Sequence, residues 1–504
     1  MEVWNKFKQN KLAFGALYFL VLLALAAIYA PLIGNNKPLI IHTSHDLIFR
    51  DYLDSAEGTL VSILEQLKEG KAVSSKNARW LSESTRQTAL FLEDVKLADE
   101  LRSLDSLRAI GRNDQLSLKK LADLLGKASK AAIKKRTFFP LFRSLEAADI
   151  FFMLIPLFLL LLKILKPHIT KLKTASFWDR LAAAVLLSLV FGFLIATIKP
   201  ERFDAYHYKK MANQFERGEW ALFPLVAYGE NENIILEASQ APTYLLSEDE
   251  RKPEQNFHLL GTDTNGRDVL VRMIYGTRIS MSVGFVAVGI YVLIGILLGA
   301  LAGYFGGFVD TLISRIIEII ICFPVFFLIL TVMAFLKPSI YNIMIIIGLT
   351  GWTGIARLMR GEFLRLKNQE FVLAARGLGA SDYRIIFRHI LPNGMAPIIV
   401  SATFGIAGAI LTESALSFLG FGVPQPTASW GDILNNGRND IYHSWWLTVF
   451  PGVMIFLTVT AFNLIGETFR DIMDPRLRGL LSRRKKSRVQ GAGNLENQGE
   501  IQGN

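Results

Sequence analysis

Residues 277–303 read TRISMSVGFVAVGIYVLIGILLGALAG and contain one charged side chain, Arg278. At a rise of about 1.5 Å per residue, a helix of this length crosses the ~30 Å hydrocarbon core of a bilayer. Seven further apolar blocks have comparable lengths: 12–33, 148–165, 181–198, 312–336, 340–359, 395–419 and 447–469. The sequence therefore predicts an all-α polytopic membrane protein with about eight transmembrane helices.

The amino-acid composition agrees with this fold class. Hydrophobic residues make up 51% of the 504 positions without counting the 39 glycines, and the mean hydropathy is +0.33. An average soluble chain reaches only about 45–50% with glycine included. In a soluble chain, 504 residues would suggest about two to four domains. The apolar composition argues against that interpretation here. The one cysteine, Cys322, excludes an internal disulfide and a cysteine-based metal cluster.

The net charge of +11 fits either a nucleic-acid partner or a membrane protein whose cytoplasmic loops are rich in Lys and Arg. Three lysines precede the first apolar block, which is too long for a cleaved signal peptide, so we place the N-terminus in the cytoplasm. Eight spans then return the C-terminus to the same side. In this orientation the cytoplasmic segments hold 21 Lys and Arg against 10 Asp and Glu. We interpret the excess as an orientation signal and expect no nucleic-acid partner.

The predicted spans divide the chain into six parts. The polar part after the first span has apolar residues at helical spacing, such as Leu60, Ile63 and Leu67, which predicts three or four amphipathic helices. The expected order is an N-terminal cytoplasmic segment with the first transmembrane helix (1–33), an extracytoplasmic helical part (34–146), two transmembrane helices (147–198), an extracytoplasmic segment (199–276), a transmembrane core with a long loop at 360–394 (277–470), and a basic, partly disordered cytoplasmic tail (471–504).

The sequence contains no convincing pattern for catalysis or cofactor binding. Gly126-Lys127-Ala128 is the nearest approach to a phosphate-binding loop, but a Ser or Thr after the lysine and an upstream glycine are missing. His42, His45 and Asp46 could hold a metal by residue type, although a loop just after a span is a poor place for one. We therefore expect no catalytic residue, no cofactor and no metal in this chain.

The cytoplasmic loop at 360–394 has the most distinctive pattern. Helix-forming residues run from Glu370 to Ala375, and Gly377 and Gly379 can supply the positive φ that ends a helix. Ser381 can cap a second helix, which Pro392 would end. This short helix would be amphipathic, with Tyr383, Ile386, Phe387 and Ile390 on one face and Arg384 and Arg388 on the other. It would either lie on the lipid surface or fit a groove of a cytoplasmic partner.

This loop resembles the EAA loop of ABC-importer permeases, whose pattern is Glu-Ala-Ala, three residues, Gly, nine residues and Ile-x-Leu-Pro. Ala374, Ala375, Gly379, Leu391 and Pro392 fall in register, whereas Leu373 replaces the Glu and His389 the first Ile. The whole run EFVLAARGLGASDYRIIFRHILPN is similar to the form that the loop takes in the oligopeptide/dipeptide/nickel permease group.

Further segments match the same group in the same order along the chain. They are the runs that contain Gly261-Thr-Asp263 and Gly266-Arg-Asp268, Gly303-Tyr-Phe-Gly-Gly307, Gly351-Trp352, Phe418-Leu-Gly-Phe-Gly422 and Asp474-Pro-Arg-Leu-Arg478. The resemblance covers the first span and about residues 255–480. It implies the second, C-type permease subunit of a peptide-class importer. Residues 34–254 do not match, and we interpret them as an insertion that either braces a partner, contacts a binding protein or is inert scaffold.

The resemblance also implies partners and a location. Such a permease pairs with a second permease, two ABC ATPases and an extracytoplasmic solute-binding protein in the bacterial plasma (inner) membrane, with ATP and magnesium bound by the ATPase subunits. It leaves the substrate open among peptides, metal chelates and some sugars. The residues expected to couple the loop to an ATPase are Glu370, Ala374, Ala375, Gly379, Ser381, Tyr383, Ile386, Phe387, Leu391 and Pro392.

Two other groups of residues are candidates for function. Alternating Gly and Asp predict a tight extracytoplasmic turn, which is either a gate, a landing site for a binding protein or a structural elbow; its residues are Gly261, Asp263, Gly266, Arg267 and Asp268. Within the spans, Arg315 and Glu318 are three apart and are expected to pair. Glu413 is expected to face either the second permease or the substrate path, because a charge inside a membrane needs a partner.

Two alternatives to an importer subunit remain at this stage. A stand-alone channel or secondary transporter would more plausibly show internal repeats with paired broken helices. A membrane-embedded enzyme would need His, Asp or Ser residues that converge within the spans, but the predicted spans contain no His and one Asp, Asp149, at an end.

Overall fold

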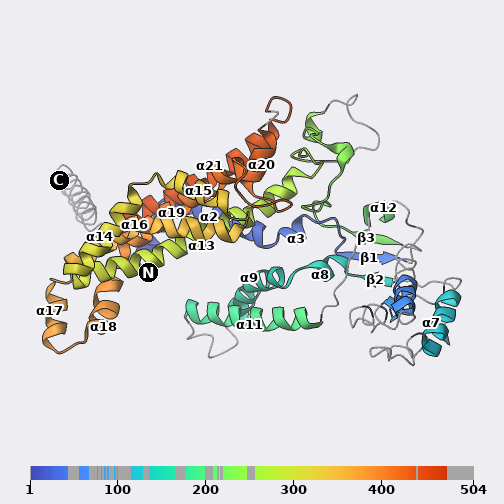
Figure 1. Cartoon of the computed structure of the whole chain (residues 1–504), viewed down its shortest axis with the longest axis horizontal. Coiled ribbons are helices and arrows are strands. Elements are labelled where there is room, and N and C mark those ends of the chain that lie inside the picture. Colours follow the sequence, from blue (N-terminus) through green and yellow to red (C-terminus); the bar gives the residue numbers. More distant parts are fainter. Residues whose placement is uncertain are drawn as a thin grey trace, which may run out of the picture. The chain divides into compact units, whose positions relative to one another are not determined.

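The computed structural model describes residues 2–43, 56–66, 115–128, 136–165, 176–198, 208–212, 219–246, 256–438 and 441–473, with a few further residues between 77 and 101 and residue 215. The chain forms two compact units: Met1–Ala30 with Tyr228–Asn504, and Pro31–Ala227 (Figure 1). The predicted disordered tail lies, from residue 474 onward, outside the described residues.

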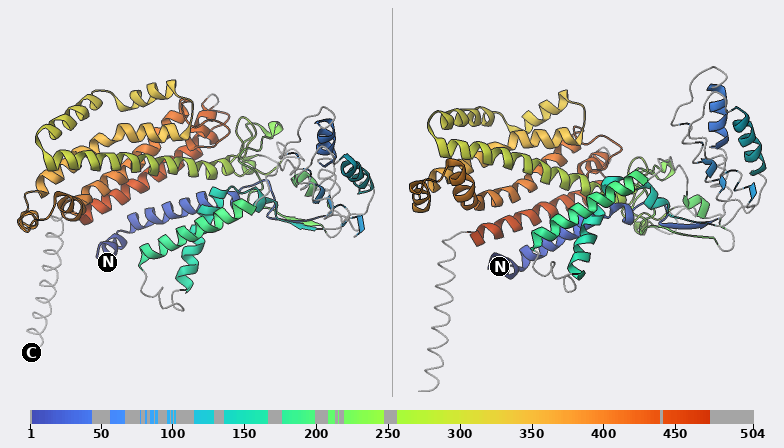
Figure 2. Two further views of the ribbon diagram at one scale, coloured as in Figure 1. Left: turned by 60° about the horizontal axis from the view of Figure 1, so that its bottom comes forward. Right: turned by 90° about the horizontal axis from the view of Figure 1, so that it is seen from below.

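The first unit is a bundle of long helices that lie side by side (Figure 2). Its helices are α1 (Glu2–Gln9), α2 (Lys11–Ile28), α13 (Val269–Phe305), α14 (Gly307–Ile321), α15 (Val325–Phe335), α16 (Ile340–Leu366), α17 (Glu370–Gly377), α18 (Asp382–Arg384), α19 (Leu391–Phe418), α20 (Trp430–Gly437) and α21 (Trp446–Met473), with short 3₁₀ turns η2 (Ile235–Glu237) and η3 (Thr243–Leu245) and the segment η4 (Ile385–Ile390). Across the described residues of both units, seven helices are long and apolar enough to cross a membrane, or eight if a bent pair counts as one span. The predicted fold class is confirmed.

The bent pair corrects one predicted span. The sequence predicted a continuous helix over 312–336, but α14 and α15 meet at an angle of 79°. Pro324 stands at this break with extended backbone (φ −60°, ψ 112°). Because proline has no N–H and disfavours a helical conformation in the residue before it, α14 ends before Pro324 and α15 begins after it.

Helices α13 and α16 form the tightest pair of the bundle. A Cβ added at Gly299 would lie 2.4 Å from the carbonyl oxygen of Ala356, and one added at Gly295 would lie 2.6 Å from Cβ of Ile355. Any larger side chain at these positions would push the two helices apart. The backbones therefore approach closely because of glycine, as in other membrane helix pairs.

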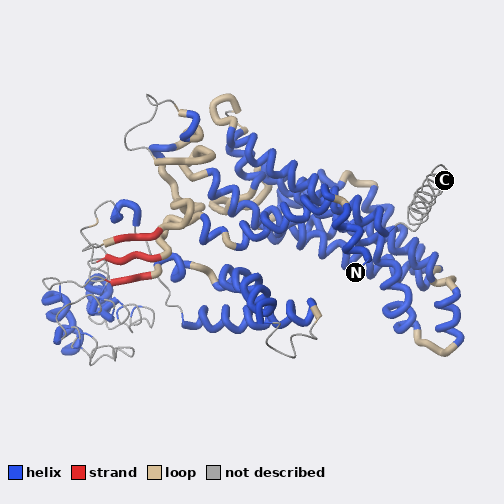
Figure 3. Tube along the Cα trace, turned by 180° about the vertical axis from the view of Figure 1, so that it is seen from behind, coloured by secondary structure: helices blue, strands red, loops and turns tan. Residues whose placement is uncertain are grey.

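The second unit contains a small antiparallel sheet with the order β2-β1-β3 (Figure 3). The central strand β1 (Ile40–Thr43) pairs with β2 (Arg136–Phe138) and with β3 (Trp220–Leu222). The sequence did not predict this sheet, which joins the parts 34–146 and 199–276. Strands of three or four residues carry almost no periodic signal, and β1 pairs with residues that lie 97 positions (Ile41 with Phe138) and 182 positions (Ile40 with Leu222) away along the chain.

Helices pack beside this sheet, in the part where the leucine spacing predicted helices but no sheet. Residues 56–66 and α7 (Gln115–Ala128) are helical, and Ile63, Leu118 and Leu121 are fully buried in one core with Ile41 of β1. Part of the predicted helical pattern, including Leu67, lies outside the described residues.

The two additional spans of this unit pack against each other. α9 (Ala147–Leu165) and α11 (Phe177–Ile198) are in contact, and the rings of Phe158 and Phe191 lie 5.6 Å apart between their centroids. Most of their other described side chains are exposed or partly exposed within this chain, as expected of helices that face lipid or a partner. Three short helices complete the unit: α3 (Ala30–Ile33), α8 (Pro140–Ser144) and α12 (Tyr208–Ala212).

Candidate functional site

The loop between α16 and α19 turns at Gly379. This residue has a φ of +79°, while Gly377 is the last residue of α17 and has no such conformation. The N–H of Gly379 bonds to the carbonyl oxygen of Arg376, and the N–H of Ala380 to that of Ala375, both at 3.0 Å. Of the two glycines predicted to end the helix, Gly379 alone does so by adopting a positive φ.

The second helix of the loop differs from the predicted one. Ser381 occupies the cap position with extended backbone, but its hydroxyl makes no capping hydrogen bond. Pro392 does not end the helix, because Asp382–Phe418 forms one helical segment of 37 residues. Just before the proline, Ile385–Ile390 is a π-helix, in which the N–H of Leu391 bonds to Ile386. The wider turn leaves room for the proline ring, which would otherwise clash with the carbonyl group four residues earlier.

The π-helix also divides the predicted apolar face. Tyr383 is 72% exposed and Phe387 is 50% exposed, and their rings are in contact, with centroids 4.6 Å apart. Ile390 is fully buried in the bundle and Ile386 is partly buried, so the four residues predicted on one face are not exposed together; the docking face expected from Tyr383 to Phe387 stays a prediction. Among the other predicted loop residues, Glu370, Ala374 and Pro392 are exposed, while Ala375 and Leu391 are partly buried.

The loop also carries an exposed apolar side chain at its turn and is held from its inner side. Leu378 is 89% exposed. On the inner side, the hydroxyl of Tyr304 donates a hydrogen bond to Asp382, and Nη2 of Arg376 donates one to the Tyr304 oxygen at 3.3 Å. Sequence analysis did not single out Tyr304, because 78 residues separate it from Asp382.

At the opposite end of α13, the predicted tight turn is present. Gly261 and Gly266 have φ values of +76° and +74°, and a Cβ at Gly266 would lie 1.9 Å from the carbonyl oxygen of Ile234. Oδ1 of Asp263 accepts the N–H groups of Asn265 (2.9 Å) and Arg267 (3.0 Å). The turn is therefore bonded to itself, as the sequence predicted.

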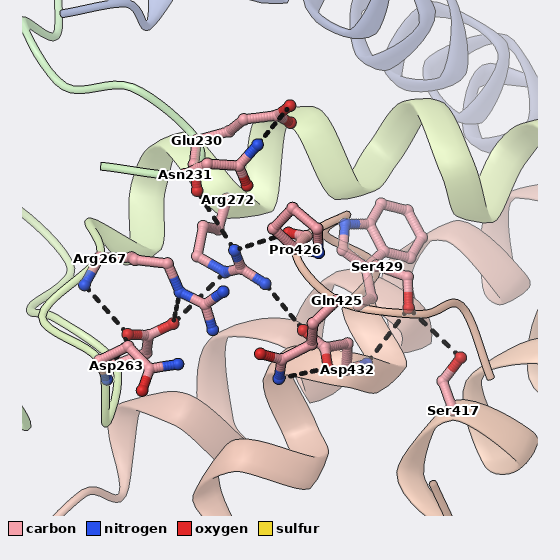
Figure 4. Close-up of polar contacts among 12 residues, drawn as sticks. Glu230, Asn231, Asp263, Arg267, Arg272, Ser417, Gln425, Pro426, Ser429 and Asp432 are labelled. Atoms are coloured by element: carbon pink, nitrogen blue, oxygen red, sulfur yellow. Dashed lines mark hydrogen bonds and ion pairs between the residues drawn. The ribbon is translucent and has the colours of Figure 1, made fainter. Parts of the chain in front are cut away.

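The charged side chains of this turn are buried among other charges (Figure 4). Nε of Arg267 lies 2.6 Å from Oδ2 of Asp263. Arg272, in the first turn of α13, lies between two carboxylates: its Nη2 is 2.7 Å from Oδ2 of Asp432, and its Nε is 3.5 Å from Oδ2 of Asp263. Nη1 of Arg272 donates to the carbonyl oxygens of Glu230 and Pro426. Burial raises the pKa of Asp432 above its usual range, against the opposing effect of the two arginines.

A buried histidine adjoins this group. Nδ1 of His258 lies 2.8 Å from Oδ2 of Asp268, and Nε2 lies 3.0 Å from Oε2 of Glu237. The Tyr228 ring packs beside the imidazole, with centroids 4.4 Å apart. Burial lowers the pKa of His258, but the hydrogen bonds to the two carboxylates outweigh it and raise that pKa above its ordinary value. Asp268 also caps α13 by accepting the N–H of Val271.

Sequence analysis did not identify this histidine as a charged centre. Its partner Glu237 lies on a short 3₁₀ turn, 21 residues earlier in the chain, with no motif around it.

Glu413 corrects another expectation. Its side chain faces neither a second permease nor an open path, since it is fully buried within this chain's own bundle. It accepts hydrogen bonds from the hydroxyls of Ser417 (2.8 Å), Ser280 (3.0 Å) and Ser414 (3.4 Å). The Oγ atoms of Ser417 and Ser429 lie 3.4 Å apart, which connects this group to the cap of α20 (Figure 4).

The other pair of charges in the spans behaves as its spacing predicted. Nη1 of Arg315 lies 2.6 Å from Oε2 of Glu318, and both side chains are largely exposed in this chain. This pair therefore differs from the buried groups around Glu413 and Arg272. It joins two residues on the surface of one helix and is not enclosed by other elements.

Comparison with known proteins gives a consistent result. Residues 295–479 match the family described as binding-protein-dependent transport system inner membrane component, and residues 1–48 match the N-terminal TM domain of oligopeptide transport permease C. The chain is 41% identical to the oligopeptide transport system permease protein OppC of Bacillus subtilis over 254 residues, which is 49% of this chain and 83% of that protein.

A second relative is the dipeptide transport system permease protein DppC of Alkalihalophilus pseudofirmus, with 44% identity over 44% of this chain and 73% of that protein. Among solved structures, an inward-facing MetNI methionine ABC transporter aligns with a TM-score of 0.34 and 16% identity, over 41% of this chain and 98% of that chain. The two family models leave residues 49–294 between them.

Proposed function

Because this chain belongs to the family of binding-protein-dependent transport system inner membrane components, as an oligopeptide/dipeptide-type ABC permease, we propose that it forms, with a second permease, a translocation path for peptides or similar small solutes. The relatives are named as oligopeptide, dipeptide and glutathione transport permeases. The chain is a multi-pass membrane component of a transporter, and its sequence carries no nucleotide-binding loop. ATP and magnesium would be bound by two separate ATPase subunits.

The loop at 360–394 is the proposed contact with an ATPase subunit. The observation that carries this assignment is the exposed pair Tyr383 and Phe387, which stands out from the bundle on a helix continuous with a span. Exposed aromatic side chains on a fixed helix suit insertion into a groove of a partner protein. Leu378 at the Gly379 turn adds apolar surface beside them.

We place this loop, with both chain termini, in the cytoplasm. The Lys and Arg excess on the loop side supports this orientation, because short cytoplasmic loops are enriched in these residues. The end with the His258 and Arg272 clusters would then face the solute-binding protein. Since the charged side chains of the 261–268 turn are buried, the turn acts as a structural elbow and not as the landing surface itself.

The proposal is tested with the assembled transporter in vesicles, with the solute-binding protein outside and ATP inside. We expect uptake of a labelled mixture of di- to pentapeptides that requires both components. Gly379→Asp should abolish uptake, because a residue with a side chain can adopt the left-handed backbone of Gly379 only with strain. The assembled complex should remain.

Gly377→Ala is the matched control, because Gly377 is helical and a Cβ there meets no neighbouring atom. This variant should keep normal uptake. Unchanged uptake by Gly379→Asp would overturn the assignment of the loop. Full uptake by this chain alone, without ATP, would instead favour a stand-alone transporter.

A further inference from the structure

Helix α13 connects the two ends of the first unit. It runs without interruption over 37 residues, which corresponds to about 55 Å of helix. It begins at Asp268, the carboxylate that caps it and contacts His258, and Tyr304 is its penultimate residue. Glycine-based packing along Gly295, Gly299 and Gly303 holds it tightly against α16. A force applied at Tyr304 would therefore move the helix as one body.

The phenol of Tyr304 bridges both sides of the loop's turn. Its hydroxyl donates to Asp382, in the first turn of the second loop helix, and accepts from Arg376, in the last turn of α17. The Arg376 guanidinium also lies over the Tyr304 ring, 5.9 Å from its centroid. One side chain of α13 thus contacts Arg376, before the turn at Gly379, and Asp382, after it.

Among the described residues, the other attachments of α17 and of the second loop helix to the bundle are apolar, while Lys367, just before α17, donates to the carbonyl oxygen of Gly303 at 2.9 Å. Val372, Ile385 and Ile390 are fully buried in the same core as Tyr304. Apolar contacts are not directional, so they fix the relative position of two helices less strictly than a hydrogen bond does. A hydrogen bond to a charged group fixes one geometry. Among the described residues of the two loop helices, the Tyr304 hydroxyl therefore supplies the directional contact through which α13 follows a movement of the turn at Gly379.

We propose that the hydroxyl of Tyr304 is a positioning group that ties the turn at Gly379 to α13 through Asp382 and Arg376, so that displacement of the loop by an ATPase is delivered to this helix. The inference rests on the proposed contact between the loop and an ATPase subunit. It predicts a loss of coupling, meaning peptide taken up per ATP hydrolysed, without a loss of the assembled complex.

The experiment measures uptake and ATP hydrolysis together in vesicles that contain the assembled transporter. Tyr304→Phe removes one oxygen and keeps the buried ring. We expect about a tenfold fall in peptide taken up per ATP, the order of effect of a lost hydrogen bond to a charged group. Tyr341→Phe makes the same chemical change at an exposed position near the start of α16 and should have no effect.

Variants of the acceptor separate positioning from general stability. Asp382→Asn keeps an oxygen that can accept from Tyr304, so its coupling should stay within about twofold of the unmodified protein. Asp382→Leu removes the acceptor and should lower coupling, at most as far as Tyr304→Phe, which also removes the acceptor of Arg376. The double variant Tyr304→Phe/Asp382→Leu should be no worse than Tyr304→Phe alone, because the bond to Asp382 is already lost in that variant.

The outcomes distinguish this inference from the proposed function. Suppose that Gly379→Asp abolishes uptake while Tyr304→Phe takes up the normal amount of peptide per ATP hydrolysed. The assignment of the loop then stands, and the positioning role of Tyr304 is overturned. Asp382→Asn coupling as poorly as Asp382→Leu would also overturn it, because the acceptor oxygen would then be irrelevant. If neither Gly379→Asp nor Tyr304→Phe changes uptake, the proposed function of the loop fails first.

Discussion

The two ends of helix α13 differ in the side chains that surround them and in how far these are buried. At its start, charged side chains are buried and satisfy one another: Arg272 with Asp432 and Asp263, and His258 with Asp268 and Glu237. At its end, the loop exposes the aromatic side chains of Tyr383 and Phe387. The charged side chains of the first arrangement are enclosed, although Ile235 and Leu236 beside Glu237 are exposed, whereas the second arrangement exposes its aromatic side chains and is fixed from behind by Tyr304.

This difference separates stability from coupling. Breaking a buried ion pair leaves an uncompensated charge inside the protein and destabilises it strongly. Changing an exposed side chain has little effect on stability and acts mainly on partners. We therefore expect substitutions at the charged end to unfold the protein and substitutions at the loop to uncouple it. Four predictions test this division.

The largest effect is expected from Arg272→Leu. It leaves Asp432 and Asp263 buried without one of their cations, which should cost about 3–5 kcal/mol in the free energy of unfolding. Thermal unfolding of the purified protein in detergent measures this loss. Arg315→Leu is the control: its pair with Glu318 is largely exposed in this chain and is expected to contribute about 0–1 kcal/mol. Equal losses of unfolding free energy for Arg272→Leu and Arg315→Leu would contradict the stabilising role assigned to the buried charges.

Glu413→Leu should have the next largest effect. It removes the acceptor of three serine hydroxyls in a buried site, so we expect a loss of about 1–3 kcal/mol. Glu413→Gln keeps one accepting oxygen and should lose less. A functional role in the substrate path would instead give a stable Glu413→Gln protein with altered uptake, which ligand-dependent transport assays would reveal.

The stability of the charged end should depend on pH through His258. Its pKa is raised in the folded protein. The stabilisation that it provides is therefore fully present below its unfolded value of about 6.5 and is lost as the pH rises through the raised pKa. The difference in unfolding temperature between the unmodified protein and His258→Gln should shrink across this range. A constant difference would show that His258 is not protonated in the folded state.

The smallest effects on stability are expected at the glycines of the loop. Gly379→Ala should cost about 1–2 kcal/mol because of the positive φ. Gly377→Ala should be stabilising by up to about 1 kcal/mol, because Gly377 is helical. An added Cβ meets no neighbouring atom at either position, so backbone conformation alone decides the result. Chemical unfolding of the two variants, measured side by side, checks the opposite signs.

Local patterns predicted much of this structure. The apolar blocks identified the spans, the Gly379 turn followed from its glycine, and Arg315 and Glu318 pair at the expected spacing. The break at Pro324 carried a readable signal in the proline itself. These features depend on residues that are neighbours in sequence.

Features that depend on distant residues could not be predicted in this way. Glu413 is satisfied by Ser280, which lies 133 positions away, and Arg272 by Asp432, which lies 160 positions away. A charge in a predicted span calls for a partner, but the sequence does not tell whether that partner is in the same chain. The unequal burial of the four residues predicted on one face of the loop helix has a different reason, since a π-helix changes the period on which that assignment depended.

The most direct test of the central claim is retention of an ATPase subunit by the detergent-solubilised permease pair. The doubly substituted protein Tyr383→Ser/Phe387→Ser should lose the ATPase and ATP-driven uptake, with its unfolding temperature nearly unchanged. Tyr442→Ser alters an aromatic side chain that is 94% exposed, just after α20, and should retain both. If the double variant keeps the ATPase and transports normally, the loop is not the site of coupling and the account is contradicted.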